Sequence, residues 1–121
     1  MKGLGVKGVM TKKKVLLIDL DGVLNEYKGN FNPEIIPPIK SGAKEFLIEL
    51  TKNFELKLFT TRPKELASVW VKKYELETFF SEITNEKSPA WLIIDDRCLT
   101  FDGDYASMLE KIFEFKTWYK K

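Results

Sequence analysis

The sequence predicts an α/β fold of three layers, in which a mostly parallel sheet carries helices on both of its faces. Two segments, Val15–Ile18 and Trp91–Ile94, are apolar at every position, as strands buried on both faces require. The segments between and after them alternate strand-like and helix-like spacing of apolar residues, which is typical of parallel strands joined by helices. Right-handed crossovers bring the carboxyl ends of such strands to one edge, where we expect a ligand site.

The first predicted strand covers residues 15–20. Residues 1–13 carry three glycines and show no apolar periodicity, so we expect a flexible leader ahead of a single domain at 14–121. Residues 25–38 are expected to form a turn or small hairpin over the end of the first strand, and we call this segment the flap. A long helix is excluded there by Gly29, Asn30, Pro33, Pro37 and Pro38.

Three further strands are expected at 54–60, 79–84 and 91–94, with a polar loop at 85–89. Each is a short apolar or alternating run followed by polar residues. A sheet of four strands results, and its last strand, like its first, ends in carboxylates.

Helices are expected at 39–52 and 63–74 and from residue 105 onward, where apolar residues recur at helical spacing. Pro63 suits a first helical turn, with Thr61 as the N-cap, and Asp104 suits the N-cap of the last helix. The residues expected to face the core are Ile39, Ala43, Phe46, Leu47, Leu50, Leu66, Val69, Trp70, Tyr74, Tyr105, Met108, Leu109, Ile112 and Phe113.

Composition limits the class of protein. A chain of 121 residues buries roughly two-thirds of its unfolded surface, enough for one core, and no segment approaches the roughly 20 apolar residues of a membrane span. The single cysteine, Cys98, excludes an internal disulfide and suits a reducing, cytoplasmic location. The formal net charge of +2 is too small to indicate nucleic-acid binding by itself.

Two pairs of aspartates follow the two apolar strands. Asp19 and Asp21 would project in the same direction from the first strand, and Asp95 and Asp96 follow the last. Carboxylates gathered at one sheet edge repel one another unless a divalent cation lies among them, and Gly22 lets the chain turn there. The chain has no histidine, so acid/base chemistry near neutral pH is left to carboxylates.

Thr60, Arg62, Lys87 and Arg97 are expected at or near the same edge. Each has a simpler interpretation when taken alone, as a helix cap, a surface ion pair or a solvated side chain. Together with the four aspartates they form a more specific pattern.

The order of these motifs resembles the haloacid dehalogenase (HAD) superfamily of phosphohydrolases. The first family motif, Asp-x-Asp-Gly-Val/Thr after an apolar strand, matches residues 19–23, and the second, a strand ending in Thr or Ser, matches residues 56–60. The third, a lysine, is best matched by Lys87, and the fourth, a strand ending in Asp-Asp, matches residues 92–96. The resemblance covers 14–115 and implies a Rossmann-like, HAD-like fold.

The resemblance implies a Mg²⁺-dependent phosphatase. Asp19 would be the nucleophile that forms an aspartyl-phosphate, and Asp21 the general acid and base. Mg²⁺ would be held by the Asp19 carboxylate, the Asp21 backbone carbonyl and Asp96, with Asp95 as an indirect ligand. Thr60 and Lys87 would bind the phosphoryl oxygens.

The substrate is left open by the sequence. Arg62 and Arg97 suit either substrate contacts or ion pairs that fix the carboxylates. The Asp-Asp-Arg of the fourth motif also resembles the phosphatase half of polynucleotide end-repair enzymes, so a phosphorylated metabolite, a nucleotide and a polynucleotide end are all candidates. Only the flap separates the first motif from the next helix, so the chain resembles the capless form. An open site suits a large phosphorylated partner, or a small substrate enclosed by homo-oligomerisation.

The main alternative is a receiver domain of signalling proteins, which also places acidic residues, a Thr and a Lys around Mg²⁺. Receivers carry their acidic pair on the first strand and the phosphoacceptor on a later one, whereas here the later site, Asp95-Asp96, is itself a pair. Asp21, two residues after Asp19, favours turnover over a stored phosphate. A Toprim-type nuclease requires the opposite motif order. A non-catalytic phosphate-binding regulatory module stays open.

Overall fold

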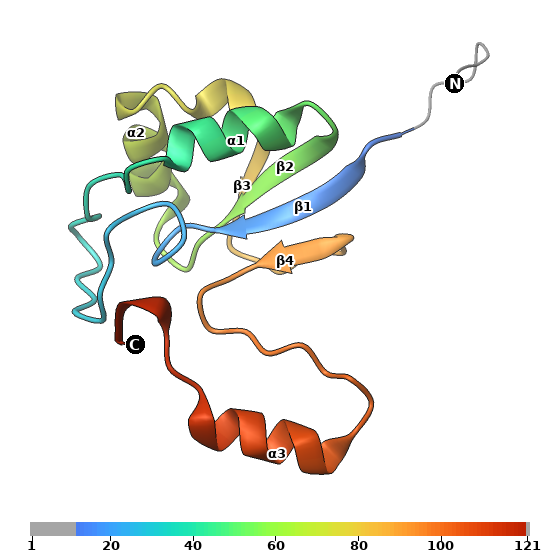
Figure 1. The fold of residues 1–121 in the computed structure, drawn as a ribbon. Helices are drawn as coiled ribbons and strands as arrows, with labels where there is room; N and C mark the ends of the chain where they lie inside the picture. The colour runs from blue at the N-terminus through green and yellow to red at the C-terminus, as the bar shows by residue number, and fades with distance from the viewer. Residues whose placement is uncertain (1–11, 121) are drawn as a thin grey trace.

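The computed structural model describes residues 12–120, and most of the predicted leader lies outside this range. The fold is a four-stranded, all-parallel sheet of strand order β3-β2-β1-β4 (Figure 1), which confirms the predicted α/β class. The strands are β1 (Lys14–Asp19), β2 (Phe54–Phe59), β3 (Phe80–Thr84) and β4 (Leu92–Ile94).

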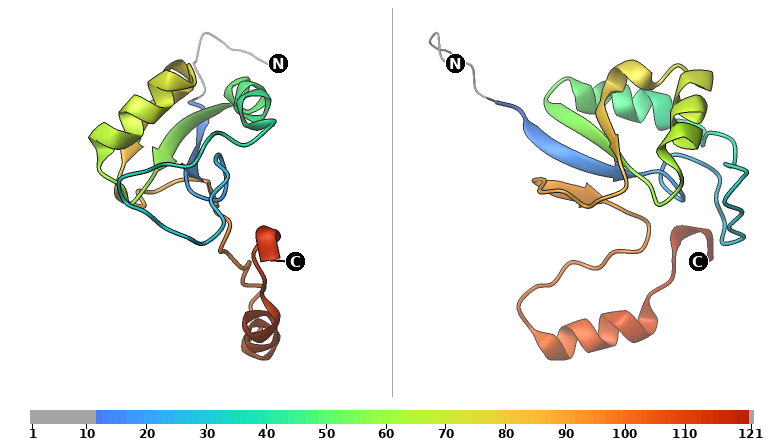
Figure 2. Two further views of the ribbon diagram at one scale, coloured as in Figure 1. Left: turned by 90° about the vertical axis from the view of Figure 1, so that its left-hand side faces the viewer. Right: turned by 180° about the vertical axis from the view of Figure 1, so that it is seen from behind.

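Two helices cover one face of the sheet. Helix α1 (Ala43–Thr51) joins β1 to β2, and α2 (Lys64–Lys73), followed by a 3₁₀ turn at Glu77–Phe79, joins β2 to β3. Figures 1 and 2 show both helices on the same side of the sheet, as two successive right-handed crossovers in one direction require. The buried core between these layers comprises Leu16, Ile18, Leu56 and Leu58 from the strands and Leu47, Ala67, Trp70 and Val71 from the helices.

Both of these helices begin later than the sequence predicts. Helix α1 starts at Ala43 because Gly42 adopts a left-handed conformation with φ 88°, which interrupts the helical path from residue 39. Helix α2 starts at Lys64, and its N-cap is Pro63 in an extended conformation, so the prediction of Thr61 as the cap is wrong.

The buried faces of α1 and α2 also differ in part from the prediction. On α2, Ala67 and Val71 are buried beside Trp70, whereas Val69 is 66% exposed. On α1, Phe46 is exposed while Ala43 and Leu47 are buried. In each helix only part of the predicted apolar face is buried.

The chain reverses its direction across the sheet after β3. Residues 85–91 pass back beyond β2 and β1 without forming a helix, and β4 then pairs with the free side of β1. Lys87 in this connection lies over the Phe59 ring at 5.3 Å. The reversal places the topological switch point between the ends of β1 and β4, where ligands of open α/β sheets bind.

Helix α3 (Tyr105–Glu114) does not pack on the sheet. It stands apart from it (Figures 1 and 2), and none of its residues is buried. The prediction that its apolar residues enter the core is therefore wrong, although Asp104 caps the helix as predicted, accepting a hydrogen bond from the Ala106 N–H. Within residues 12–120 no helix covers the second face, so the predicted third layer is not observed there.

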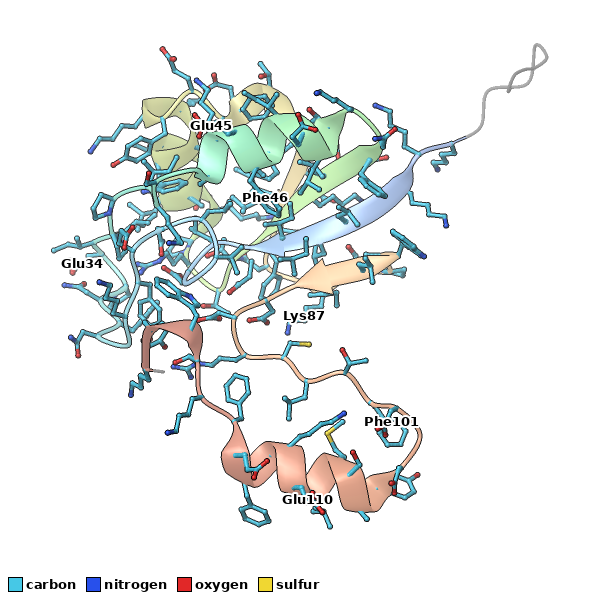
Figure 3. All side chains as sticks on the ribbon, viewed as in Figure 1. Glu34, Glu45, Phe46, Lys87, Phe101 and Glu110 are labelled. Atoms are coloured by element: carbon cyan, nitrogen blue, oxygen red, sulfur yellow. The ribbon has the colours of Figure 1, made fainter. Side chains whose placement is uncertain are left out.

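Residues 97–116, which we call the excursion, leave the sheet after β4 and carry α3 at their far end. Figure 3 shows Phe101 and Glu110 on this excursion, away from the sheet, with Lys87 near β4. The chain then returns, and Trp118 donates a hydrogen bond from its indole Nε1 to the Gly22 carbonyl at 2.7 Å. Among the described residues, no helix has the length and apolar character needed to cross a membrane.

Candidate cation and phosphate site

Three carboxylates meet at the switch point. Asp19 is the last residue of β1, and Asp95 and Asp96 directly follow β4, which pairs with β1 up to the Ile18–Ile94 position. One oxygen from each of the three lies within 4.8 Å of the others, so the sequence prediction that these carboxylates share one edge is confirmed. We call Asp19, Asp95 and Asp96 the carboxylate cluster.

Gly22 makes room for this cluster. Its backbone has φ +85°, and a Cβ built there would overlap Asp96 Oδ2 and lie 2.6 Å from its Cγ. Glycine is thus required both by the left-handed conformation and by the close approach. Asp96 Oδ2 is itself buried without a hydrogen-bond partner in the described part of the chain, which is costly unless another group, such as a cation, satisfies it.

The crowding of the carboxylates changes their acidity. Burial, followed by the charges of Asp95, Asp96 and Asp21, raises the pKa of Asp19 from its ordinary 3.8 to about 8, against the opposing charge of Lys87. Burial and the neighbouring Asp95 raise the pKa of Asp96 to about 6. A metal-free cluster therefore holds a proton on Asp19 near neutral pH.

Asp95 shifts in the opposite direction. Burial acts to raise its pKa, but the Arg97 backbone N–H, a hydrogen bond with Asp96 and the charge of Lys87 outweigh burial and lower it. Asp95 and Asp96 thus behave as a pair that shares one proton.

The donor set fits a hard divalent cation. Carboxylate oxygens are the ligands that Mg²⁺, Ca²⁺ and Mn²⁺ prefer, and a cation would replace the proton that the cluster otherwise retains. The orphaned Asp96 Oδ2 is consistent with such a ligand. The cluster does not by itself select one of these cations.

The side chain of Asp21 is not part of this cluster. Arg62 Nε donates to Asp21 Oδ2 at 3.0 Å, and Arg62 Nη2 donates to Asp21 Oδ1 at 3.1 Å. The Arg62 side chain is fully buried. The sequence leaves two roles open for Arg62, a substrate contact and an ion pair that fixes a carboxylate. The structure shows the ion pair.

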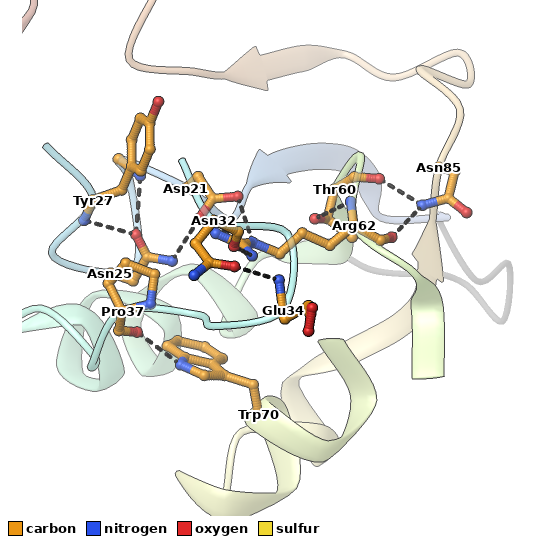
Figure 4. A network of polar contacts seen from close by, with 11 residues as sticks. Asp21, Asn25, Tyr27, Asn32, Glu34, Pro37, Thr60, Arg62, Trp70 and Asn85 are labelled. Carbon is orange, nitrogen blue, oxygen red and sulfur yellow. Dashed lines mark hydrogen bonds and ion pairs between the residues drawn. The ribbon is translucent and has the colours of Figure 1, made fainter. Parts of the chain in front are cut away.

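Two asparagines complete the surrounding network (Figure 4). Asn25 is completely buried; its Oδ1 accepts from the backbone N–H groups of Gly22 and Tyr27, and its Nδ2 donates to Asp21 Oδ1. Asn85 Nδ2 donates to the carbonyls of Thr60 and Arg62 at 2.6 and 2.9 Å. Sequence reasoning missed both; the only signal for Asn25 is an asparagine placed in a turn after an apolar run.

Thr60 and Thr61 are placed differently from one another. Thr60 is 1% exposed and its Oγ1 accepts a hydrogen bond from the Arg62 N–H. Thr61, which the sequence predicts only as a cap, lines the cavity beside the cluster. Thr60 thus lies at the predicted strand end, but it is not among the residues that line this cavity.

Lys87 and Arg97 lie at the margin of the site. Lys87 Nζ is 3.5 Å from Asp95 Oδ2, and its side chain is half exposed. Arg97 is exposed, and its Nη2 donates to the Tyr119 hydroxyl at 3.2 Å. Both lysine and arginine are therefore available to an anion that approaches the cluster.

An open cavity of about 400 Å³ gives access to the cluster. A larger cavity of about 760 Å³, formed in part by Phe54 and Phe80 near the starts of β2 and β3, shares no residue with it. The access cavity is lined by Asp19, Asp21, Tyr27, Phe31, Thr61, Lys87, Asp95, Asp96 and Arg97.

Comparison of the chain with family models, with curated proteins and with solved structures finds no significant match. Any assignment of function therefore depends on the residues themselves.

Proposed function

We propose that this protein is a phosphatase that requires a divalent cation, Mg²⁺ in the first instance, and hydrolyses phosphate monoesters through an aspartyl-phosphate on Asp19. The observation that carries the proposal is the convergence of the Asp19, Asp95 and Asp96 oxygens within 4.8 Å, beside Lys87 and an open cavity. A cation bound there supplies positive charge that polarises the phosphoryl group and offsets its developing negative charge. The resemblance to the HAD superfamily is part of this proposal.

The nucleophile in this scheme is the Asp19 carboxylate. One of its oxygens attacks phosphorus, the bond from phosphorus to the leaving oxygen breaks, and Asp21 gives that oxygen a proton. Water then attacks the same phosphorus, Asp21 takes its proton, and the bond from phosphorus to Asp19 breaks to release phosphate. Asp21 suits this role because its side chain lines the access cavity without belonging to the cluster.

The phosphoryl oxygens are assigned to Lys87 and to the end of β2. Lys87 is only half exposed, and its Nζ lies 3.5 Å from Asp95 Oδ2. Its ammonium group is therefore held close to where a phosphate beside Asp19 would bind. At the end of β2, Thr61 lines the cavity, and we add it to Thr60 as a candidate donor. Arg97, exposed at the margin, is free to contact the remainder of the substrate.

The direct test is phosphate release from a panel of phosphorylated metabolites, nucleotides, polynucleotide ends and phosphopeptides, with and without Mg²⁺. The matched control is Asp19→Asn, which keeps the shape of the side chain and removes the nucleophile. We expect multiple turnovers that depend on Mg²⁺ in the wild type and none in the variant. Activity that survives Asp19→Asn would contradict the proposal.

The kinetics also separate the phosphatase from the receiver-like alternative. A receiver would accept one phosphoryl group per chain from a small phosphodonor and keep it. A stable phosphoprotein without turnover would therefore favour the receiver, whereas binding of phosphate with neither result would favour a regulatory module.

A further inference from the structure

Arg62 uses its guanidinium to join two parts of the site. Nε and Nη2 donate to Asp21, while Nη1 donates to the Asn32 carbonyl of the flap at 2.6 Å. The flap residue Phe31 stacks on the guanidinium, with its ring centroid 4.6 Å from Cζ. With its side chain fully buried, Arg62 has no surface left with which to meet a substrate.

Asp21 would be a natural additional ligand for a cation at the cluster. It lies two residues after Asp19, lines the same cavity, and is near enough for its charge to contribute to the raised pKa of Asp19. Carboxylates beside a divalent cation tend to join its coordination shell, since each adds a favourable charge interaction. The paired hydrogen bonds to Arg62 oppose this movement and balance the charge of Asp21.

The flap depends on the same contact. Apart from the Asn25–Ile39 bridge at its base, it has no regular strand pairing. Trp70 Nε1 donates to the Pro37 carbonyl, Ile36 packs against the core, and Tyr27 meets Tyr119 edge to face. The Arg62–Asn32 hydrogen bond and the Phe31 stacking therefore connect the cavity side of the flap to the end of β2.

We propose that Arg62 is a positioning residue that keeps the Asp21 carboxylate out of the cation site, holds it in place to take the proton of the hydrolytic water, and fastens the flap beside it. The proton-transfer part depends on the phosphatase function proposed above. The parts that concern the cation and the flap do not, so they can be tested separately.

Cation affinity is the first test. Mg²⁺ alone is titrated by calorimetry into the wild type, Arg62→Gln, Asp21→Asn and the double variant. Loss of Arg62 leaves an unbalanced carboxylate, so we expect Arg62→Gln to bind Mg²⁺ on the order of tenfold more tightly. Asp21→Asn leaves an unbalanced guanidinium and should bind more weakly, and the double variant should return to near the wild-type affinity.

Loss of the positive charge at Arg62 favours Mg²⁺ by itself, so Arg62→Lys, which keeps the charge but loses the planar fork, is titrated as well. If the fork keeps Asp21 away from the cation, Arg62→Lys should also bind Mg²⁺ more tightly than the wild type. The proposal is overturned if Arg62→Gln binds no more tightly than the wild type, or if the double variant binds as tightly as Arg62→Gln. Should Arg62→Gln fail to fold, Arg62→Lys decides alone, and an affinity equal to that of the wild type overturns the proposal.

Protease sensitivity tests the flap. Trypsin can cut after Lys28, an exposed residue of the flap. Arg62→Lys keeps the positive charge but loses the planar fork, so we expect faster cleavage after Lys28 than in the wild type. The control is Lys57→Gln, which removes a β2 lysine paired at 3.2 Å with Glu82 and should leave the rate unchanged. Equal cleavage rates in the wild type and Arg62→Lys would overturn the flap contact.

Activity completes the test. If the wild type is a phosphatase, Arg62→Lys should lower kcat strongly with little change in KM, because the substrate is bound elsewhere while Asp21 is misplaced. An unchanged kcat overturns the positioning role. If the wild type releases no phosphate from any substrate, the proposed function fails, and the calorimetry and proteolysis still decide the role of Arg62.

Discussion

Gly22 and Asp96 are in contact across the site: a methyl group on Gly22 would occupy the position of Asp96 Oδ2. The contact joins the turn after β1 to the turn after β4, so it fixes how closely the two ends of the cluster approach. Any side chain at residue 22 must displace a carboxylate.

Gly22→Ala should therefore abolish cation binding as well as lower stability. The left-handed backbone costs a residue with a Cβ about 1–2 kcal/mol, and displacement of Asp96 removes a ligand. Gly42→Ala is the matched control, because Gly42 has φ +88° and a methyl group there would meet no atom within 4 Å. Mg²⁺ calorimetry and thermal unfolding should show a stability loss in both variants and lost binding only in Gly22→Ala. Equal cation affinities in the two variants would show that the contact is unimportant.

The stability of the cation-free protein should fall as the pH rises. Because the pKa of Asp19 is raised from 3.8 to about 8, the folded state holds this proton more tightly than the unfolded chain does. The resulting stabilisation is complete below about pH 3.8 and is lost as the pH rises through about 8. Asp19→Asn lacks this dependence.

The measurement is the melting temperature of the wild type and Asp19→Asn between pH 4 and 8 in a chelator. The variant should gain stability relative to the wild type as the pH rises, and Mg²⁺ at pH 8 should reduce this difference by stabilising the wild type. Parallel pH profiles for the two proteins would mean that Asp19 does not titrate in this way.

The apolar face of α3 should contribute little to stability. Leu109 is 57% and Ile112 53% exposed, so Leu109→Ser and Ile112→Ser should each change the free energy of unfolding by no more than about 0.5 kcal/mol. Leu47→Ala is the comparison, since Leu47 is fully buried and such truncations cost about 2–5 kcal/mol. Losses of the Leu47 size at residues 109 and 112 would mean that α3 packs against the sheet in solution.

Asn25 should be sensitive to a change of one atom. Asn25→Asp keeps the acceptor for Gly22 and Tyr27 but replaces the donor to Asp21 with a second carboxylate. We expect a loss of stability at pH 7 that is largely recovered near pH 4, where a protonated carboxyl can donate to Asp21. Asn25→Ala, which removes all three hydrogen bonds, should cost about 2–4 kcal/mol at both pH values. Denaturant unfolding at the two pH values measures these free energies. A loss of stability in Asn25→Asp that is the same at both pH values would contradict the prediction.

The strands and the carboxylate cluster could be predicted because short-range patterns specify them. Continuous apolar runs place β1 and β4, and parallel connections then bring Asp19 to Asp95 and Asp96. The partner of Asp21 could not be predicted in this way. Arg62 is 41 residues away in sequence. An arginine after a strand suits a substrate contact as well as an ion pair with a carboxylate, and only the path of the flap decides between the two.

The position of α3 could not be predicted from the sequence either. Its apolar stripe correctly predicts a helix, since Tyr105–Glu114 is helical. The stripe does not specify what the helix packs against.

The pairing of β4 with β1 has a consequence for the order of folding. The first strand of the chain has one side unsatisfied until the last strand arrives, with Leu16 and Leu92 as neighbours despite their separation along the chain. Contacts this distant form late, and an open strand side invites association with other chains while it waits. A divalent ion that binds only when β1 and β4 are paired would favour this pairing. Refolding yields should therefore depend on which ions the buffer contains.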